Sequence, residues 1–340
     1  MSTITASAPA KLILCGEHAV VYGRPAIALP LVGIRARAEI VPGQPGSGIS
    51  ILARDLRRRW RVADDPGHPL SELITSTLAH YGAPGSTPDL RITIKSTIPI
   101  ASGMGSGAAV ATALVRALAV YLDRDLPPEA ISALVYASEQ RFHGTPSGID
   151  NTVIAYEQPI WFIRQSSLPA VSSQLQEASN NEQRTTDNEQ RTIEPITIAA
   201  PFTLLIGDTG VRSATREPVG HVRQRWQADP ARYEALFDQI GRLVTKARSL
   251  LAQGDLASLG PLLSQNHILL QQAGVSAPEL DALVAAAQQA GVLGAKLSGA
   301  GWGGVILALV APEHQNAVAH ALRQAGAKRV IATTVREHFV

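Results

Sequence analysis

The residues best suited to chemistry begin with a glycine-rich stretch in the N-terminal half of the chain. Residues 100–118 have the sequence IASGMGSGAAVATALVRAL, so three spaced glycines, at 103, 105 and 107, run into an alanine-rich segment with a helical pattern. A dinucleotide-binding loop would follow the first strand of a βαβ unit and precede an acidic residue by about 20 positions. Here the next twenty residues are predicted to be helical, so the loop is a poor match to a dinucleotide-binding loop. A Walker A sequence is also absent from the chain.

Two interpretations of this loop remain open from its own residues. Backbone N–H groups in a glycine-rich turn, followed by a helix N-terminus, form a cradle for polyphosphate. Glycine suits that role because the backbone must approach the phosphates closely. The same sequence also suits a purely structural turn between a strand and a helix.

Two further segments contain polar residues beside glycine. Residues 8–31 place Lys11 on an early strand, followed by Glu17 and His18 in a glycine-flanked turn. Near the C-terminus, residues 294–309 form a second glycine-rich turn, GAKLSGAGWGG, that leads into a strand.

A fourth segment, EQRFHGTPSGIDNTV at 139–153, ends one helix and starts another. Ser147 and Asp150 have the S-x-x-D spacing of a helix N-cap pair. On that interpretation alone, Asp150 is a capping carboxylate with no chemical role.

Taken together, four motifs resemble those of the GHMP kinases, and within that family they are most similar to the mevalonate kinases. The motifs are KLILCGEHAVVYGRPAIA, HGTPSGIDN, DTGVRSATRE (208–217) and KLSGAGWGG. Their order and spacing extend the resemblance over nearly the whole chain. It implies a two-domain α+β fold, with ATP and the small-molecule substrate mevalonate meeting in the cleft between the domains.

The resemblance also implies roles for individual residues. Asp150 would face the hydroxyl that is phosphorylated, with Lys11 beside it. The residues implied to wrap the ATP triphosphate are Ser102, Gly103, Met104, Gly105, Ser106, Gly107 and Ala108. Those implied to hold Mg²⁺ are Glu139 and Ser106, and those implied to line the acceptor site are Glu17, His18, Thr215 and Ser298.

Elementary chemistry agrees with these roles. Phosphoryl transfer needs positioning and charge neutralisation more than covalent help, and Mg²⁺ prefers few carboxylates together with phosphate oxygens and water. An aspartate in the first turn of a helix is kept ionised by the helix dipole. Asp150 could therefore accept the hydroxyl proton, or only orient the hydroxyl while Lys11 stabilises the alkoxide. The sequence leaves both roles open.

The chain departs from the family pattern at two positions. Gly107 stands where the family's loop usually has a second serine whose hydroxyl reaches Mg²⁺, and Ala214 stands where related kinases often have serine. Four other functions therefore stay open beside mevalonate kinase. They are phosphomevalonate kinase, mevalonate 3-kinase, homoserine kinase and a catalytically inactive GHMP-fold sensor. Arg212 and Arg216 could serve a phosphorylated acceptor, whereas the presence of Lys11, Glu139 and Asp150 argues against an inactive protein.

Strands and helices in both halves of the chain must position these motifs. Strands are expected over 34–43, 90–100, 196–210, 305–312 and 329–335. Helices are expected over 107–122, 127–142, 228–253, 255–272, 277–290 and 313–325. The domains predicted are an N-terminal one over 1–168 and a C-terminal one over 196–340. Between them, residues 169–195 are predicted to form a flexible polar loop, because this segment repeats NEQRT and has few apolar residues.

Composition narrows the class of protein further. The 340 residues are 45% hydrophobic and 17% charged with a net charge of +2, which gives no reason to expect a nucleic-acid or membrane partner. The N-terminus does not have the pattern of a signal peptide, and the single Cys15 excludes an internal disulfide. A cytoplasmic protein is predicted, and the family resemblance suggests a homodimer.

Overall fold

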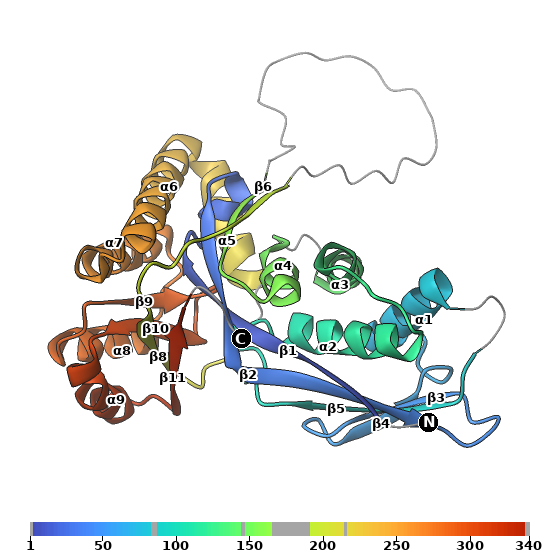
Figure 1. Ribbon diagram of the computed structural model, residues 1–340. Coiled ribbons are helices and arrows are strands. Elements are labelled where there is room, and N and C mark those ends of the chain that lie inside the picture. The colour runs from blue at the N-terminus through green and yellow to red at the C-terminus, as the bar shows by residue number, and fades with distance from the viewer. Residues whose placement is uncertain (1–2, 83–86, 144–146, 165–190, 214–215, 337–340) are drawn as a thin grey trace, which may run out of the picture.

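Two β-sheets, each covered by helices, form the framework of the protein (Figure 1). The computed structural model describes residues 3–82, 87–143, 147–164, 191–213 and 216–336. Sheets and helices occur in both halves of the chain, which confirms the predicted α+β class.

The larger sheet is built around one long strand, β2 (Ala26–Pro42). Its first part pairs with β6 and its last part with β5, while β1 runs antiparallel along its other edge. The order is β4-β3-β5-β2-β6-β7, with β1 paired to β2 off this path. The remaining strands are β1 (Ile4–Cys15), β3 (Ile49–Ala53), β4 (Arg58–Arg61), β5 (Leu90–Ser96), β6 (Ile160–Arg164) and β7 (Arg191–Pro195).

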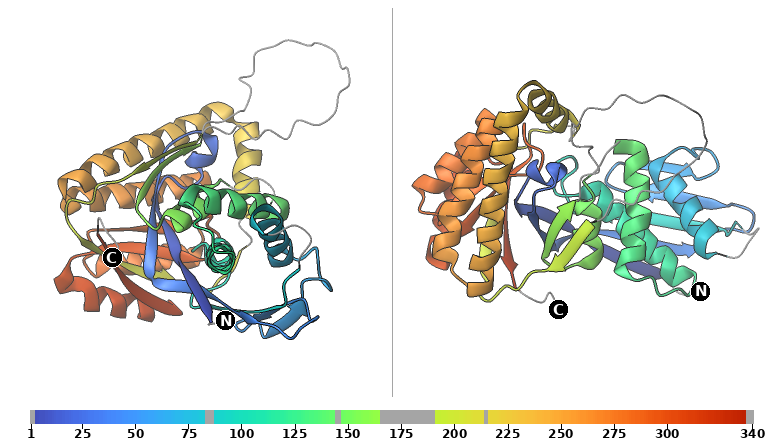
Figure 2. Two further views of the ribbon diagram at one scale, coloured as in Figure 1. Left: turned by 45° about the vertical axis from the view of Figure 1, so that its right-hand side comes forward. Right: turned by 90° about the horizontal axis from the view of Figure 1, so that it is seen from above.

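Helices of the N-terminal half gather on one face of this sheet (Figure 2). They are α1 (Pro69–Tyr81), α2 (Ser106–Tyr121), α3 (Pro128–His143) and α4 (Ile149–Tyr156), whereas the short 3₁₀ helix η1 (Ala19–Tyr22) lies apart from them, against β6 and α6. Helix α2 packs on β1 and β2, and most of its buried positions are alanine. Small side chains let this helix lie close to the sheet, with its N-terminus beside β1.

The second sheet has the order β11-β8-β10-β9. Its strands are β8 (Phe202–Asp208), β9 (Gly294–Ser298), β10 (Val305–Val310) and β11 (Arg329–Val335). All six residues of β10 are buried, as expected for an inner strand covered on both faces. The accompanying helices are α5 (Arg216–Ala228), α6 (Pro230–Gln253), α7 (Leu256–Ala273), α8 (Pro278–Gln289), η2 (Pro312–His314) and α9 (Gln315–Gln324).

The polar segment predicted as a loop between the domains has a different place in the topology. Strand β7, at 191–195, pairs antiparallel with β6, so the chain on both sides of this segment belongs to the larger sheet. The chain passes to the second sheet only after Pro195. Residues 165–190, which contain most of the duplicated NEQRT sequence, lie outside the described residues.

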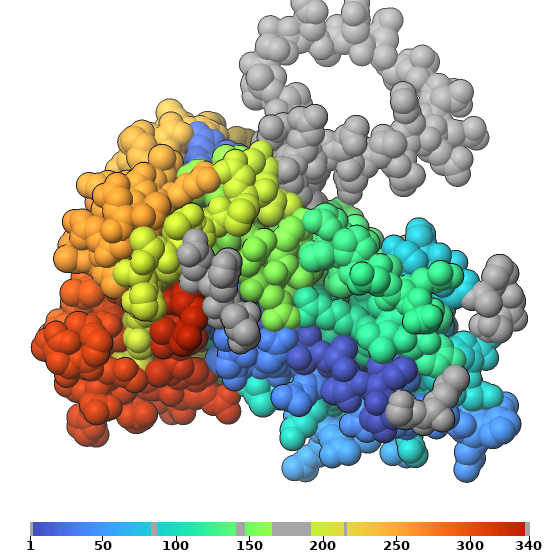
Figure 3. Space-filling model, viewed as in Figure 1, coloured from blue at the N-terminus to red at the C-terminus, as the bar shows by residue number. Residues whose placement is uncertain are grey.

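The two halves pack directly against each other (Figure 3). Strand β1 contacts β9 and α7, and η1 contacts α6.

Among the described helices, none combines the length and apolar character needed to cross a bilayer.

Gly294 and Gly260 allow β9 and α7 to approach with backbone contact. A Cβ at position 294 would lie 1.9 Å from the carbonyl oxygen of Gly260, and a Cβ at 260 would lie 2.1 Å from that of Leu293. We predict that Gly294→Ala lowers the free energy of unfolding by about 1–3 kcal/mol or more, because the backbone must move to admit the methyl group. Denaturation in urea would measure the change.

Gly220→Ala is the matched control. Gly220 lies within α5, and a Cβ there would meet nothing within 4 Å. Alanine should raise the free energy of unfolding by up to about 1 kcal/mol through its better helix propensity. Equal changes in the free energy of unfolding for Gly220→Ala and Gly294→Ala would contradict the close approach of α7 and β9.

Candidate active site

The glycine-rich loop of residues 101–105, here called the phosphate loop, joins β5 to the N-terminus of α2. Gly103 and Gly105 have left-handed φ values of +79° and +69°. Gly105 must also lack a side chain, because a Cβ there would lie 2.9 Å from both Lys11 Cγ and Ile154 Cδ1. The Lys11 N–H donates to the Met104 carbonyl at 3.1 Å, which fixes the loop to β1.

The N-terminus of α2 is suited to binding an anion. The N-cap is Gly105, which supplies no side-chain hydrogen bond to the first turn. The first N–H groups of a helix have no partner within it and carry the positive end of its dipole. Ser106, Gly107 and Ala108 form this first turn.

Gly107 has ordinary helical surroundings. It is exposed, its φ is not left-handed, and an added Cβ would meet nothing within 4 Å. Backbone geometry therefore does not require glycine at this position, and a serine would fit.

Lys11 and Asp150 form an ion pair next to the phosphate loop. Lys11 Nζ lies 2.8 Å from Asp150 Oδ1, and the Lys11 side chain is only 4% exposed whereas that of Asp150 is 32% exposed. The pair thus has its cation inside the protein and its carboxylate at the surface of the site. A ligand can reach the free side of Asp150.

Asp150 is not held as a capping residue. The N-cap of α4 is Gly148, with φ of +84° and no side-chain cap hydrogen bond. Ser147 Oγ accepts only a long 3.4 Å bond from the Ile149 N–H. The N-cap interpretation of the S-x-x-D spacing is therefore wrong, because Lys11, distant in sequence, takes the carboxylate instead.

Glu139 belongs to the same electrostatic group. Burial and the neighbouring Asp150 carboxylate raise the pKa of Glu139 to about 8, while Lys11 opposes this shift. Two carboxylates thus share one ammonium group. Among the described residues there is no cluster of three or more His, Cys, Asp or Glu side chains that could hold a metal by itself.

The second glycine-rich turn, here called the C-terminal loop (299–304), lies against the phosphate loop. A Cβ at Gly299 would lie 3.4 Å from Gly103 Cα, and one at Gly304 would lie 2.8 Å from the Ser102 carbonyl oxygen. Both loops line one small cavity, whose wall is formed by Ala101, Ser102, Gly103, Ser213, Ser298, Ala300, Gly301, Gly303 and Gly304.

The DTG segment also supports the C-terminal loop. Thr209 Oγ1 donates to the Gly304 carbonyl at 2.8 Å, and Ser213 Oγ donates to the Gly301 carbonyl at 2.8 Å. Arg212 forms two hydrogen bonds to Asp208, at 2.8 and 3.0 Å. Thr215, predicted to line the acceptor site, lies outside the described residues.

The other three residues predicted to line the acceptor site are buried at the join between the domains. Glu17 is paired with Lys296, and Ser298 Oγ accepts from the Ile13 N–H at 3.2 Å and donates to the Ile13 carbonyl at 2.9 Å. His18 Nε2 lies 2.8 Å from the Ala300 carbonyl oxygen. Lys296 was not among the residues predicted from the sequence, although a lone charge within a buried strand is a usable signal.

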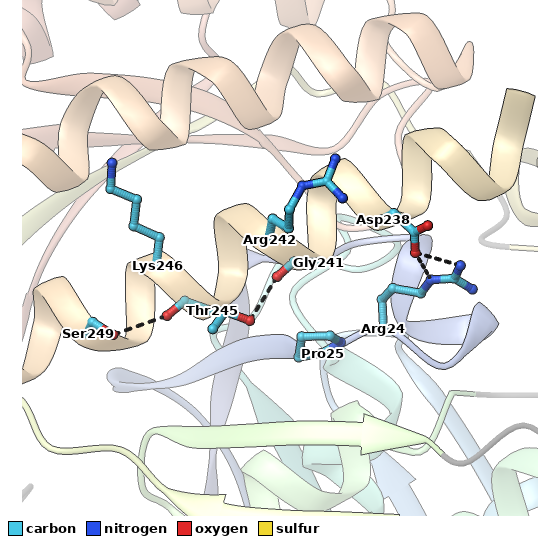
Figure 4. A pocket seen from close by; sticks show the side chains of 8 residues that line it. All are labelled: Arg24, Pro25, Asp238, Gly241, Arg242, Thr245, Lys246 and Ser249. Atoms are coloured by element: carbon cyan, nitrogen blue, oxygen red, sulfur yellow. Dashed lines mark hydrogen bonds and ion pairs between the residues drawn. The ribbon is translucent and has the colours of Figure 1, made fainter.

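A larger hollow lies away from these motifs. It has a volume of about 480 Å³ and is lined along α6 by Asp238, Gly241, Arg242, Thr245, Lys246 and Ser249, with Arg24 and Pro25 opposite (Figure 4). Arg24 is already bonded to Asp238 there, at 2.7 and 3.0 Å. We place the candidate active site at the two loops, where the reactive groups converge.

The chain belongs to the GHMP kinase family, since residues 71–158 match the GHMP kinases N terminal domain and residues 247–328 match GHMP kinases C terminal. The predicted GHMP kinase fold is thereby confirmed, and the protein is an ATP-using kinase. Similar proteins include the mevalonate kinase of Thermococcus sibiricus, which is 33% identical over 98% of this chain and 97% of its own length.

Solved structures agree with this assignment. The L. major mevalonate kinase in complex with R-mevalonate has a TM-score of 0.79 and 29% identity, covering 99% of this chain and 97% of that one. The Streptococcus pneumoniae phosphomevalonate kinase, in complex with phosphomevalonate and AMPPNP, has a TM-score of 0.78. It is 18% identical, covers 98% of this chain and 100% of that one, and shares the fold alone.

The burial of His18 predicts a pH-dependent stability. Desolvation lowers the pKa of His18 from 6.5 to about 4, opposed by its bond to the Ala300 carbonyl. The folded state therefore keeps this ring neutral, while the unfolded chain binds a proton below pH 6.5. The contribution of the neutral His18 ring to the free energy of unfolding is complete above pH 6.5. It is lost as the pH falls toward 4, by about 1.4 kcal/mol per pH unit at most.

Comparison with His18→Asn isolates this contribution, because asparagine removes the titrating ring and is among the residues most often found at positive φ, which is 59° at position 18. We predict that the free energies of unfolding of wild type and variant, measured in urea, converge as the pH falls from 7 to 4.5. A difference that stays constant over this range would contradict the buried neutral ring.

Proposed function

We propose that the protein transfers the γ-phosphoryl group of ATP to the primary hydroxyl of mevalonate, giving 5-phosphomevalonate. The observation that carries the proposal is the Lys11–Asp150 ion pair, which places an accessible carboxylate beside the phosphate loop. The near full-length similarity to mevalonate kinases supports mevalonate as the acceptor.

Asp150 is the residue proposed to meet the acceptor hydroxyl. Its carboxylate is open on one side and is held on the other by Lys11. It can orient the hydroxyl and accept its proton as the oxygen attacks phosphorus. Lys11, almost fully buried, supplies a fixed positive charge that stabilises the developing alkoxide.

The phosphate loop and the start of α2 are proposed to hold the triphosphate. The N–H groups of Ser106, Gly107 and Ala108 supply donors, and the helix dipole favours negative charge. Gly103 and Gly105 let the backbone turn without side chains in the way. The contact with the C-terminal loop closes the other side of this cradle.

Mg²⁺ is the metal proposed for this site, held by Glu139 and Ser106. The donor set fits a hard cation, because the Glu139 carboxyl group lies close enough to the Asp150 carboxylate to raise its pKa, and a bound cation would favour the ionised form of Glu139. When bound with ATP, Mg²⁺ neutralises phosphate charge. Glu139 contributes the carboxylate, and the helical Gly107 leaves room for a water where the family usually has serine.

A phosphorylated acceptor is less well supported. Arg212, a candidate cation for a second phosphate, already forms a bidentate pair with the Asp208 carboxylate. Partial burial would raise the pKa of Asp208, but the bonds from Arg212 and the Gly210 N–H outweigh it and lower that pKa, and the guanidinium group of Arg212 is engaged in this pair. The homodimer and the cytoplasmic location remain predictions, and sedimentation would test the former.

A panel of acceptors tests the proposed substrate. We predict that ADP release is fastest with mevalonate and at least tenfold slower with 5-phosphomevalonate, homoserine or galactose, each compared by kcat/KM. Faster turnover of 5-phosphomevalonate would overturn the assignment and would direct attention to Arg212 and Arg216.

Asp150→Asn tests the role of the carboxylate. We predict that turnover falls by about 10² to 10⁴, because an amide cannot accept the proton, while AMPPNP affinity changes little. Asp255→Asn is the control, since Asp255 is a partly exposed N-cap of α7 whose carboxylate accepts from the Ser258 N–H at 3.0 Å. If the folded Asp150→Asn protein turned over at the wild-type rate, Asp150 would have no part in the reaction.

The dependence of rate on free Mg²⁺ tests the metal site. Gly107→Ser should remain active and lower the Mg²⁺ concentration for half-maximal rate, because serine adds an oxygen ligand without strain. Glu139→Ala should raise that concentration sharply. An unchanged Mg²⁺ dependence in both variants would show that the metal lies elsewhere.

A further inference from the structure

Glu17 and Lys296 form an ion pair that is sealed inside the protein. The Lys296 side chain is fully buried and that of Glu17 is 1% exposed. Lys296 Nζ donates to Glu17 Oε1 and to the Leu297 carbonyl oxygen, the latter at 2.6 Å. One residue lies in the turn after β1 and the other on β9, so the pair crosses from the first sheet to the second.

This pair is a poor source of stability. Removing two charges from water costs several kcal/mol per ion, and their attraction often fails to recover it. Within the described structure, Glu17 Oε2 has no hydrogen-bond partner, so the carboxylate is only half satisfied. Apolar side chains of similar volume would serve the core as well.

The turn that presents Glu17 is tightly constrained. Gly16 has a φ of +102°, and a Cβ there would lie 2.5 Å from both Ala26 Cα and the Pro25 carbonyl oxygen. His18 follows with a φ of 59°. These two left-handed residues direct the Glu17 side chain inward, toward β9.

Two further contacts lie on either side of the pair. Ser298 exchanges two hydrogen bonds with the Ile13 peptide, and His18 bonds to the Ala300 carbonyl oxygen. Lys296, Ser298 and Ala300 therefore hold β9 and the start of the C-terminal loop to β1 and its turn. From there the loop continues directly onto Gly103 and Ser102 of the phosphate loop.

We propose that Glu17 and Lys296 are positioning residues for ATP, which fix the C-terminal loop against the phosphate loop and so complete the triphosphate cradle. This proposal rests on ATP being the phosphoryl donor, but not on mevalonate being the acceptor. Neither residue needs to touch the nucleotide. Their charges select one register of β9 relative to β1, which an apolar pair would not specify.

The test separates stability from nucleotide binding. Lys296→Met leaves a buried unpaired carboxylate and should lower the melting temperature. The double variant Glu17→Met/Lys296→Met should recover most of that loss. Its dissociation constant for AMPPNP, measured by calorimetry without any acceptor, should nevertheless rise at least tenfold, and its KM for ATP should rise more than its kcat falls.

The matched control is Arg248→Met/Glu194→Met, which removes a half-exposed ion pair of 2.5 Å between α6 and β7, far along the chain from both loops. It should keep the wild-type AMPPNP affinity. Wild-type affinity in a stable Glu17→Met/Lys296→Met protein would overturn the proposal, as would an equal loss of affinity in the control.

Two further results keep the outcomes distinct. If the double variant does not fold, Glu17→Gln replaces it. This substitution should raise the AMPPNP dissociation constant at least threefold. An unchanged dissociation constant would overturn the proposal. A wild type that binds AMPPNP but phosphorylates none of the acceptors would refute the proposed function and leave the role of the pair intact.

Discussion

The buried ammonium of Lys11 is the constraint on which the site depends. An amino group that is almost fully removed from water must be paired, and Asp150 supplies its partner at 2.8 Å. This requirement brings the first turn of α4 to β1. It also fixes the phosphate loop, because the Lys11 side chain occupies the space where residue 105 would place a Cβ. One ion pair thus sets the distance between the carboxylate and the N-terminus of α2.

The second sheet contributes the C-terminal loop, which follows β9 and packs against the phosphate loop of the N-terminal half. Gly299 and Gly304 of the C-terminal loop pack against the backbone of Gly103 and Ser102, and Thr209 and Ser213 hold the C-terminal loop through hydrogen bonds to its carbonyl groups. Such backbone contact demands an accurate register between β1 and β9. The buried pair of Glu17 and Lys296, the hydroxyl of Ser298 and the ring of His18 all act at this join, so the residues around the site hold its two halves together.

Most of the helices could be predicted from the sequence, because the spacing of apolar residues that indicates a helix lies within one short segment of the chain. The amphipathic α6 begins two residues later than predicted and ends at the predicted residue 253, and α2 begins within one residue of its expected start. Helix α5 was missed because most of it is exposed, with only Pro218 and Val222 buried. Helix α1 was also missed, although Pro69 and His68 mark its start.

The site was harder to predict where it depends on partners distant in the chain. Local spacing suggested that Asp150 caps its helix, and only the family resemblance placed Lys11, 139 positions earlier, beside it. Glu17 and Ser298 were expected to line the acceptor site; in the structure Glu17 Oε1 bonds to Lys296 and Ser298 Oγ bonds to the Ile13 peptide. The family motif identifies which residues gather at the site. The packing of β1 against β9 shows which of their polar atoms are already bonded within the protein.

A crystal structure of the protein with mevalonate and AMPPNP would test the central claim most directly. We predict that the primary hydroxyl of mevalonate lies within about 3.2 Å of an Asp150 carboxylate oxygen, with Lys11 still paired to the same residue. The triphosphate should lie over the first turn of α2. A hydroxyl more than 4 Å from Asp150, or a nucleotide bound away from the phosphate loop, would contradict the claim.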